Sequence, residues 1–118
     1  MPLSSHLILE LGREGDAAVV SARGDIDLST LAKVTAALDG ARSGVHTLIL
    51  DLREVGFMDT SGLRLVIEEQ RRAAQGGYRF AVVRGPSRVQ RLFEIAGLAG
   101  EDGLFVDAPP RPASGGGG

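Results

Sequence analysis

The sequence predicts a single α/β domain in which a mixed sheet of about five strands carries its helices mainly on one face. Its 118 residues are 43% hydrophobic, which suits one domain with a real core. Apolar runs of strand length alternate with amphipathic helical patterns, and an alternating N-terminal stretch adds one hairpin. The expected order of elements is therefore β-β-α-β-α-β-α-β.

The first two strands are expected to form the hairpin. Leu7, Leu9 and Leu11 alternate with other residues, as in a half-buried strand. Gly12 to Asp16 has the length and residues of a hairpin loop. Ala17 to Arg23 is then the second strand, antiparallel to the first.

A turn and the first helix follow. The turn is Gly24-Asp25-Ile26-Asp27, and either Asp27 or Ser29 is the expected helix cap. Gly44 closes the helix. Its apolar face is formed by Leu31, Val34, Leu38 and Ala41.

The central part of the chain is expected to be a strand, a turn and the second helix. Val45 to Leu52 is almost wholly apolar, which predicts a buried, parallel strand. Arg53 to Asp59 then leads into a helix from Thr60 to about Gln75, which Gly76 and Gly77 stop. Its predicted apolar face is Leu63, Val66, Ile67, Gln70 and Ala74. The opposite, solvated face carries Arg64, Glu68, Glu69, Arg71 and Arg72.

The last elements are a strand, a third helix and a short final strand. Tyr78 to Arg84 is the strand, Pro86 fits the first helical position, and Gly97 ends the helix. The apolar face of this helix is Val89, Leu92, Phe93 and Ala96. Leu104 to Val106 is the final strand. We expect the domain to occupy residues 1–107 and the Pro/Gly-rich stretch 108–118 to be a disordered tail.

Composition argues against several classes of function. The net charge is −2 and no basic stripe is interleaved with aromatic residues, so direct nucleic-acid binding is not expected. There are no cysteines, and His6 and His46 are isolated, so neither a metal site nor a cofactor is expected. No apolar run approaches a membrane span and no signal-peptide pattern is present, so we expect a cytoplasmic protein that does not enter membranes.

The stretch Phe57 to Leu63 is the most informative part of the chain. It lies at a strand-to-helix turn, where a helix exposes unpaired N–H groups and the positive end of its dipole. Asp59, Thr60 and Ser61 stand at this point. Such residues are common helix caps, and Gly62 permits close packing, so capping alone is one interpretation. A phosphorylated hydroxyl would also be tolerated there.

An enzymatic role is weakly supported. A Ser or Thr nucleophile needs a base within hydrogen-bond reach, and no histidine occupies a comparable turn. Asp25, Asp27 and Asp59 could gather around Thr60, but no phosphate-binding loop is present. Ser61 also lacks the flanking glycines of a nucleophile elbow. We therefore do not expect catalysis.

A protein-binding surface fits the pattern better. Thr60 follows the carboxyl end of a strand, the usual place for sites in open α/β sheets, and the Gly24–Leu28 turn should lie beside it. The expected surface is acidic, bears hydroxyl groups and includes Met58 and Leu63 as exposed apolar residues. The alternative for Met58 and Leu63 is packing in the core.

Two motifs resemble those of STAS domains, specifically the anti-sigma factor antagonists. The first is Leu50-Asp51-Leu52 followed by Phe57-Met58-Asp59-Thr60-Ser61-Gly62-Leu63. The second is Gly24-Asp25-Ile26-Asp27, which resembles that family's Gly-Glu-Ile-Asp. The resemblance covers Leu7 to Val106, and the family's architecture agrees with the predicted fold.

The resemblance implies a partner-switching role. Anti-sigma factor antagonists bind an anti-sigma factor that is a serine/threonine kinase, which frees the sigma factor for transcription. The kinase then phosphorylates the residue after the motif Asp, and a PP2C-type phosphatase reverses this. Here that residue is Thr60, with Ser61 as the fallback.

The resemblance also assigns a partner-binding surface and shows two departures from the family pattern. Asp27 matches the family's acidic residue near the acceptor, whereas Asp25 stands where Glu is usual. Arg64 stands where many members have Gly, so it could narrow the choice of kinase or indicate a role without one. The expected partner-binding residues are Asp25, Asp27, Met58, Asp59, Ser61, Gly62, Leu63 and Arg64.

Two other functions remain open. One is a non-switching STAS adaptor, either a subunit of a transport ATPase or part of a stress-signalling scaffold. The other is a sensor of a small ligand such as a nucleotide or lipid, for which the sequence offers little because most aromatic residues look like core.

Overall fold

The structure of the chain, a computed structural model, describes residues 6–98, 100 and 103–107. Its strands and helices follow one another in the predicted order. They are β1 (Leu7–Glu14), β2 (Ala17–Ile26), α1 (Leu31–Arg42), β3 (Thr47–Met58), α2 (Thr60–Gly76), β4 (Arg79–Val83), α3 (Ser87–Ile95) and β5 (Phe105–Val106). The predicted tail at 108–118 lies outside the described residues, so its disorder stays a prediction.

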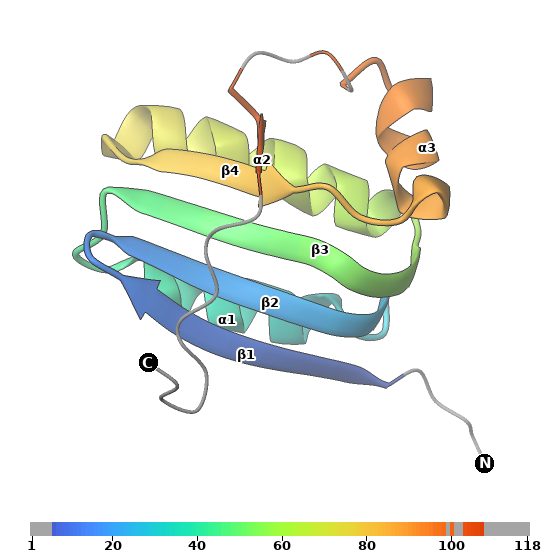
Figure 1. Cartoon of the computed structure of the whole chain (residues 1–118), viewed down its shortest axis with the longest axis horizontal. Helices are drawn as coiled ribbons and strands as arrows, with labels where there is room; N and C mark the ends of the chain where they lie inside the picture. The colour runs from blue at the N-terminus through green and yellow to red at the C-terminus, as the bar shows by residue number, and fades with distance from the viewer. Residues whose placement is uncertain (1–5, 99, 101–102, 108–118) are drawn as a thin grey trace.

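The strands form one mixed sheet whose spatial order, β1-β2-β3-β4-β5, repeats their order in the chain. β1 is antiparallel to β2, and every later neighbouring pair is parallel. A helix lies in the connection of each parallel pair, in the order α1, α2 and α3. Figure 1 shows α1 and α2 crossing behind the sheet and α3 beside its upper end. The predicted α/β fold is confirmed.

The main core lies between the sheet and the helices. Buried side chains of all three helices belong to one cluster with those of the sheet, which confirms that the helices pack mainly on one face. The helical members include Val34, Leu38, Leu65, Val66, Val89 and Phe93. A smaller cluster of Val19, Ile49, Ala81 and Val83 occupies the other face of the sheet.

The hairpin between β1 and β2 is tighter than predicted. The strands pair as far as Glu14 and Ala17, so the loop is Gly15-Asp16 and not the whole of 12–16. Gly15 has a φ of 58°, a conformation that suits glycine in a two-residue hairpin turn. The predicted strand thus extends through residues that composition alone suggested were loop.

The strands β2 and β3 run further than predicted, to Ile26 and Met58. The predicted turn at Gly24–Asp27 is therefore mostly strand, and the predicted lead at Arg53–Asp59 is almost wholly strand. The register between β2 and β3 shifts twice, once between Ser21 and Arg23 and once between Gly24 and Asp25. Such β-bulges bend a strand and change which side chains face the core.

The buried face of α2 differs from the predicted one by about one position. Leu63 and Ile67 are only partly buried and Ala74 is exposed. The residues that are buried are Gly62, Leu65, Val66, Glu69 and Ala73. Glu69, which was expected on the solvated face, is 5% exposed. Its burial is possible because Arg42 and Tyr78 donate hydrogen bonds to its carboxylate.

The other helices agree closely with expectation. In α1 the buried residues are Val34, Leu38 and Ala41, as predicted. Pro86 is the residue before α3 and not its first residue. Val89 and Phe93 are buried as predicted and Leu92 is partly buried, but Ala96, predicted on the apolar face, follows the helix and is exposed. No helix among the described residues is long and apolar enough to cross a membrane.

Candidate functional site

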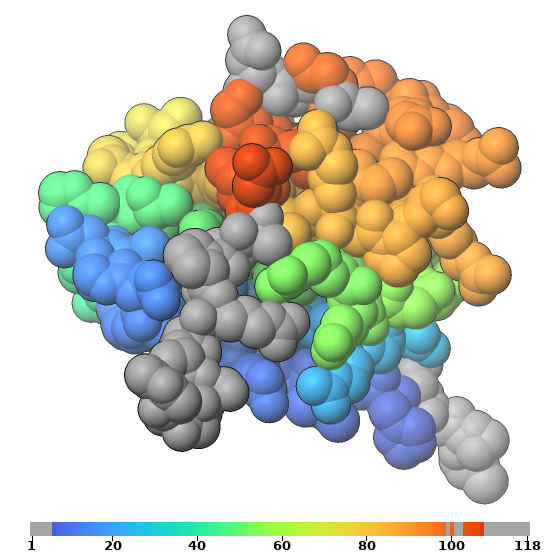
Figure 2. Space-filling model, in the orientation of Figure 1, coloured from blue at the N-terminus to red at the C-terminus, as the bar shows by residue number. Residues whose placement is uncertain are grey.

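The candidate site lies where the parallel strands end, which we call the carboxyl edge. Ile26 and Met58 are register partners at the ends of β2 and β3. The Asp59 N–H donates to the Ile26 carbonyl over 3.2 Å, so the chain leaving β3 is fixed to the chain leaving β2. Figure 2 shows the green end of β3 protruding between the blue end of β2 and the orange α3. The two predicted motifs therefore meet, as the sequence indicated.

Asp59 caps the helix α2. Its Oδ1 accepts from the Ser61 N–H over 2.9 Å and from the Ser61 hydroxyl over 2.5 Å. These bonds satisfy one of the unpaired N–H groups of the first turn and place a carboxylate at the positive end of the helix dipole. The Ser61 hydroxyl is consequently tied to Asp59.

The hydroxyl of Thr60 has a different environment from that of Ser61. It is the first residue of α2 and is exposed, whereas Ser61 is half-buried. The Thr60 hydroxyl forms no hydrogen bond with any residue in the described part of the chain. Its oxygen is thus available to a partner or to a modifying enzyme.

Asp27 organises the loop before α1. Its Oδ1 accepts from the Ser29 N–H over 2.9 Å, from the Ser29 hydroxyl over 2.6 Å and from the Thr30 N–H over 3.2 Å. The Thr30 hydroxyl accepts from the Asp27 N–H and donates to the Asp25 carbonyl. The N-cap is Thr30, so the expected cap at Asp27 or Ser29 was wrong, although Asp27 does bond the N–H groups just before the helix.

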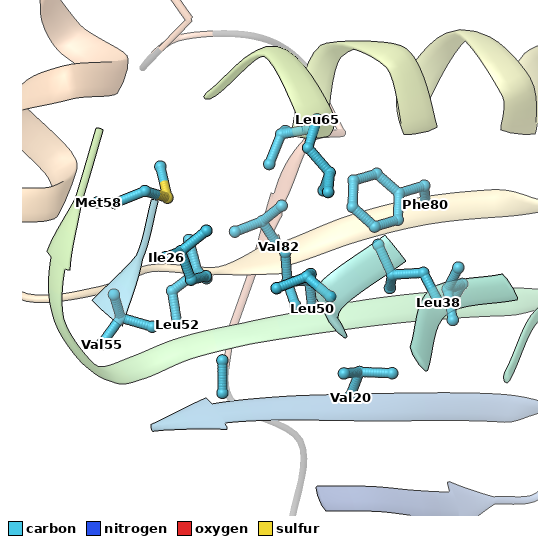
Figure 3. Packing of buried hydrophobic residues seen from close by; sticks show 14 of the residues in the cluster. Val20, Ile26, Leu38, Leu50, Leu52, Val55, Met58, Leu65, Phe80 and Val82 are labelled. Atoms are coloured by element: carbon cyan, nitrogen blue, oxygen red, sulfur yellow. The ribbon is translucent and has the colours of Figure 1, made fainter. Parts of the chain in front are cut away.

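Met58 and Gly62 belong to the core and not to the surface. Met58 is 2% exposed, and Figure 3 shows it among the labelled core residues near Ile26. A Cβ added at Gly62 would lie 2.6 Å from Met58 Cγ and 3.0 Å from Ile26 Cγ2, so a glycine is needed for this packing. Leu63 is partly buried against the same core. The prediction that Met58 and Leu63 are exposed apolar contacts was wrong and the alternative, packing in the core, holds, because β3 continues to Met58 and its side chain joins the main core.

Two exposed apolar residues at this edge were not predicted. Phe57, next to Met58, is 45% exposed, and Leu28, in the loop before α1, is 77% exposed. Leu28 stands between the polar residues Asp27 and Ser29 in a turn, where an apolar side chain is unusual, and that is the signal in the sequence. These two side chains replace Met58 and Leu63 as candidate apolar contacts.

A groove of about 310 Å³ separates the start of α1 from the start of α2, and we call it the α1–α2 groove. Leu28, Leu31 and Thr35 line one side of it. The other side is formed by α2 residues: Thr60, Ser61, Arg64, Leu65 and Glu68. The predicted residues Thr60, Ser61 and Arg64 are therefore brought together beside a partly apolar depression.

The charges at the edge are mixed. Asp25, Asp27 and Asp59 are half-buried carboxylates, whereas Arg64 is exposed and has no ion pair with a described residue. No group of three His, Cys, Asp or Glu side chains capable of holding a metal ion occurs among residues 6–98, 100 and 103–107. Neither Thr60 nor Ser61 hydrogen-bonds a histidine within those ranges.

The family of the chain follows from its sequence match. Residues 9–107 match the family model described as "Mlab, STAS domain". The chain belongs to this STAS family. The match runs from residue 9, within β1, through β5 and includes both motifs at the carboxyl edge.

Solved structures show that the STAS fold of this chain is shared with anti-sigma factor antagonists. One is the unphosphorylated anti-sigma factor antagonist SpoIIAA, 23% identical over 86% of this chain and 89% of that one, with a TM-score of 0.71. Another is an anti-sigma factor antagonist from Mycobacterium paratuberculosis, 22% identical over 85% of this chain and 86% of that one, with a TM-score of 0.75. A third is phosphorylated SpoIIAA from Bacillus, 22% identical over 86% of this chain and 92% of that one, with a TM-score of 0.66.

Proposed function

We propose that this STAS domain is an anti-sigma factor antagonist. It binds an anti-sigma factor serine/threonine kinase through the carboxyl edge and thereby regulates sigma-factor-dependent transcription. Phosphorylation of Thr60 by that kinase ends the interaction, and a PP2C-type phosphatase restores it. In this proposal the domain acts as a cytoplasmic binding protein and not as an enzyme.

The observation that carries the proposal is the contrast between two neighbouring hydroxyls. The Ser61 hydroxyl is held by Asp59 at 2.5 Å, whereas the Thr60 hydroxyl is exposed and has no partner in the described part of the chain. Thr60 is therefore the better acceptor of a phosphoryl group. In the reaction, Thr60 Oγ1 bonds to the γ-phosphorus of ATP, its proton passes to a base of the kinase, and ADP leaves.

The docking surface combines apolar and charged groups. Phe57 and Leu28 offer exposed apolar area, and such anchors commonly carry most of the energy of an interface. Asp25, Asp59 and Arg64 surround the acceptor and supply polar complementarity. Asp27, by contrast, is engaged with its own loop, so its contribution is to hold the shape of the surface.

The switch requires a change of charge and no change of fold. A phosphate on Thr60 adds about −1.5 to −2 charges, which the N-terminus of α2 tolerates. The same charge enters a surface that already contains Asp25, Asp27 and Asp59. A partner that fits the unmodified surface then meets like-charge repulsion and a larger desolvation cost. The solved phosphorylated and unphosphorylated forms of SpoIIAA support such a modification in a protein of this fold.

The test is calorimetry of Thr60 variants against the cognate kinase. Thr60→Ala should bind as tightly as the unmodified protein and should resist phosphorylation. Thr60→Glu should bind more weakly, and phosphorylated protein should bind more weakly still, since a phosphate carries more charge than a carboxylate. Circular dichroism controls for folding, and Ser61→Ala is the matched control for position. Equal affinities of the unmodified and phosphorylated proteins would contradict the switch.

A second candidate is the non-switching STAS adaptor of a transport ATPase or signalling scaffold. The observation that favours it is that Asp59 and Asp27 both act as caps of N–H groups, so the motif has a structural use without any phosphate. A partner recovered from the host that lacks kinase activity, together with unmodified Thr60, would favour this candidate.

A further inference from the structure

Arg64 lies one helical turn after Thr60, and both residues line the α1–α2 groove. Residues four apart in a helix are neighbours on one face. Helical side chains also lean toward the N-terminus, so a long side chain covers the turn before its own Cα. The Arg64 side chain therefore belongs over the turn that begins at Thr60.

The guanidinium of Arg64 has no competing ion pair among the described residues. Arg64 is exposed, and no salt bridge joins it to any of them. The nearest acidic residue further along the helix is Glu68, which lines the same groove one turn on. That order, a base before an acid at four-residue spacing, is the weaker one, because it opposes the helix dipole. An acidic group at Thr60 would have the stronger order.

We propose that Arg64 is an internal receptor for the phosphate on Thr60, so that phosphorylation folds the guanidinium back onto its own helix. This inference rests on the proposed function for the identity of the modified residue. Arginine presents paired N–H donors that match two phosphate oxygens, and Arg64 lines the same groove as Thr60.

The contact makes the switch act in two ways. Phosphorylation adds negative charge at Thr60, and it also withdraws a cation that the unmodified surface offers to an acidic partner. A glycine at this position would have no side chain for either role. Arg64 thereby links the choice of partner to the modification state.

The test uses protein that carries phosphothreonine at position 60 by chemical synthesis and ligation, so that no kinase is needed. The probe is the ³¹P resonance of the phosphate, titrated from about pH 4 to about pH 8, across the phosphate's second ionisation. A neighbouring cation favours the dianion and lowers this pKa. The second pKa of the phosphate should be roughly 0.3 unit lower in the phosphoprotein that retains Arg64 than in its Arg64→Gln variant. That difference is about twofold in the acid dissociation constant of the phosphate.

Two variants make the comparison specific. Arg71→Gln removes the same charge from an exposed position on α2 three turns from Thr60, so it should leave the midpoint unchanged. Arg64→Lys keeps the charge and should recover part of the shift. The acidic residues nearby, Asp25, Asp27, Asp59 and Glu68, are retained in every variant. They therefore cannot cause a change in the phosphate midpoint that occurs only when Arg64 is substituted.

Identical midpoints for Arg64→Gln and Arg71→Gln would overturn the inference. A shift that is present at low salt and shrinks toward 1 M salt would support it, since the pair is solvent-accessible. Failure of the proposed function is distinguishable, because equal kinase affinities of the two phosphorylation states would leave the ³¹P result intact.

Discussion

The Glu69 carboxylate on α2 accepts two hydrogen bonds from the Arg42 guanidinium on α1, over 2.9 and 3.1 Å. Glu69 is 5% exposed, and the Tyr78 hydroxyl donates a third bond to it over 2.6 Å. Hydrogen bonding of the Arg42 guanidinium to the Glu69 carboxylate is the main reason that the pKa of Arg42 is raised. This cluster ties the last residue of α1 to the middle of α2, away from the carboxyl edge.

We expect Glu69→Ala to lower the free energy of unfolding by about 1–3 kcal/mol, because Tyr78 and Arg42 lose a buried acceptor. The loss is moderated because Arg42 retains its ion pair with Asp39 at 2.8 Å. Urea denaturation measures the change. Glu68→Ala, an exposed neighbour, is the control and should change stability by less than about 0.5 kcal/mol. Equal effects of the two substitutions would contradict the cluster.

Stability should fall in alkali through Tyr78. Burial, and then the hydrogen bond to Glu69, raise the pKa of Tyr78 above its ordinary value of 10.0. The neutral phenol is thus favoured in the folded protein, and its contribution is present below the unfolded pKa and lost as the pH rises through the higher folded value. The free energy of unfolding should therefore decrease as the pH rises above about 9, and by less in Tyr78→Phe.

The absorbance of tyrosinate checks the same point directly. Tyr78 is the only tyrosine in the chain, so the signal reports this residue alone. Its midpoint in the folded protein should lie above that in urea. A folded midpoint at or below the unfolded one would show that Tyr78 is not held by Glu69.

Alanine substitutions at two glycines should change the stability of the domain in opposite directions. Gly24 has a φ of 119°, and an added Cβ would collide with the backbone carbonyl of His6. Gly24→Ala should therefore destabilise the domain by about 2–4 kcal/mol. Gly40 lies exposed within α1 with open space around it, so Gly40→Ala should stabilise by roughly 0.5–1 kcal/mol. Thermal unfolding of both variants measures the pair, and a stable Gly24→Ala protein would contradict the close approach of β1 and β2.

Alanine substitutions at the adjacent residues Phe57 and Met58 should have different effects, one on partner binding and the other on stability. Phe57→Ala and Leu28→Ala remove exposed side chains, so they should weaken partner binding while leaving the melting temperature nearly unchanged. Met58→Ala empties a buried position and should cost about 2–4 kcal/mol of stability. Calorimetry with the partner and thermal unfolding, run on all three variants, give the two measurements. If the double variant Leu28→Ala and Phe57→Ala binds the partner with normal affinity, these two residues are not part of the interface.

The sequence predicted the parts of the fold that depend on uninterrupted patterns. The apolar run around Leu48 and Leu50 could hardly be solvated, and these residues are 0% and 1% exposed. Gly77, expected to stop α2, follows it in the left-handed conformation with a φ of 78°. The position of Thr60 at the start of a helix also followed from local residues, because caps and stops act within one turn.

The orientation of Phe57 and Met58 could not be predicted in the same way. Residues 53–59 combine polar side chains with Gly56, a pattern that indicates a loop and assigns no faces, but pairing with β2 extends β3 through them as far as Met58. Glu69 is a second case, because the groups that make its burial possible come from Arg42 on another helix and Tyr78 after the helix ends. Both errors concern interactions between elements, which local periodicity does not contain.

The spatial order of the strands has a consequence for how the chain assembles during synthesis. Because each strand pairs with the one before it, the growing sheet extends at one edge. No later strand has to insert between two strands that have already formed. Contacts between consecutive elements keep the loops to be closed short, which favours rapid folding. Once residue 58 has left the ribosome, β1, β2, α1 and β3 are all available to pair and pack. Thr60, the proposed acceptor, thus emerges directly after the strands that will flank it.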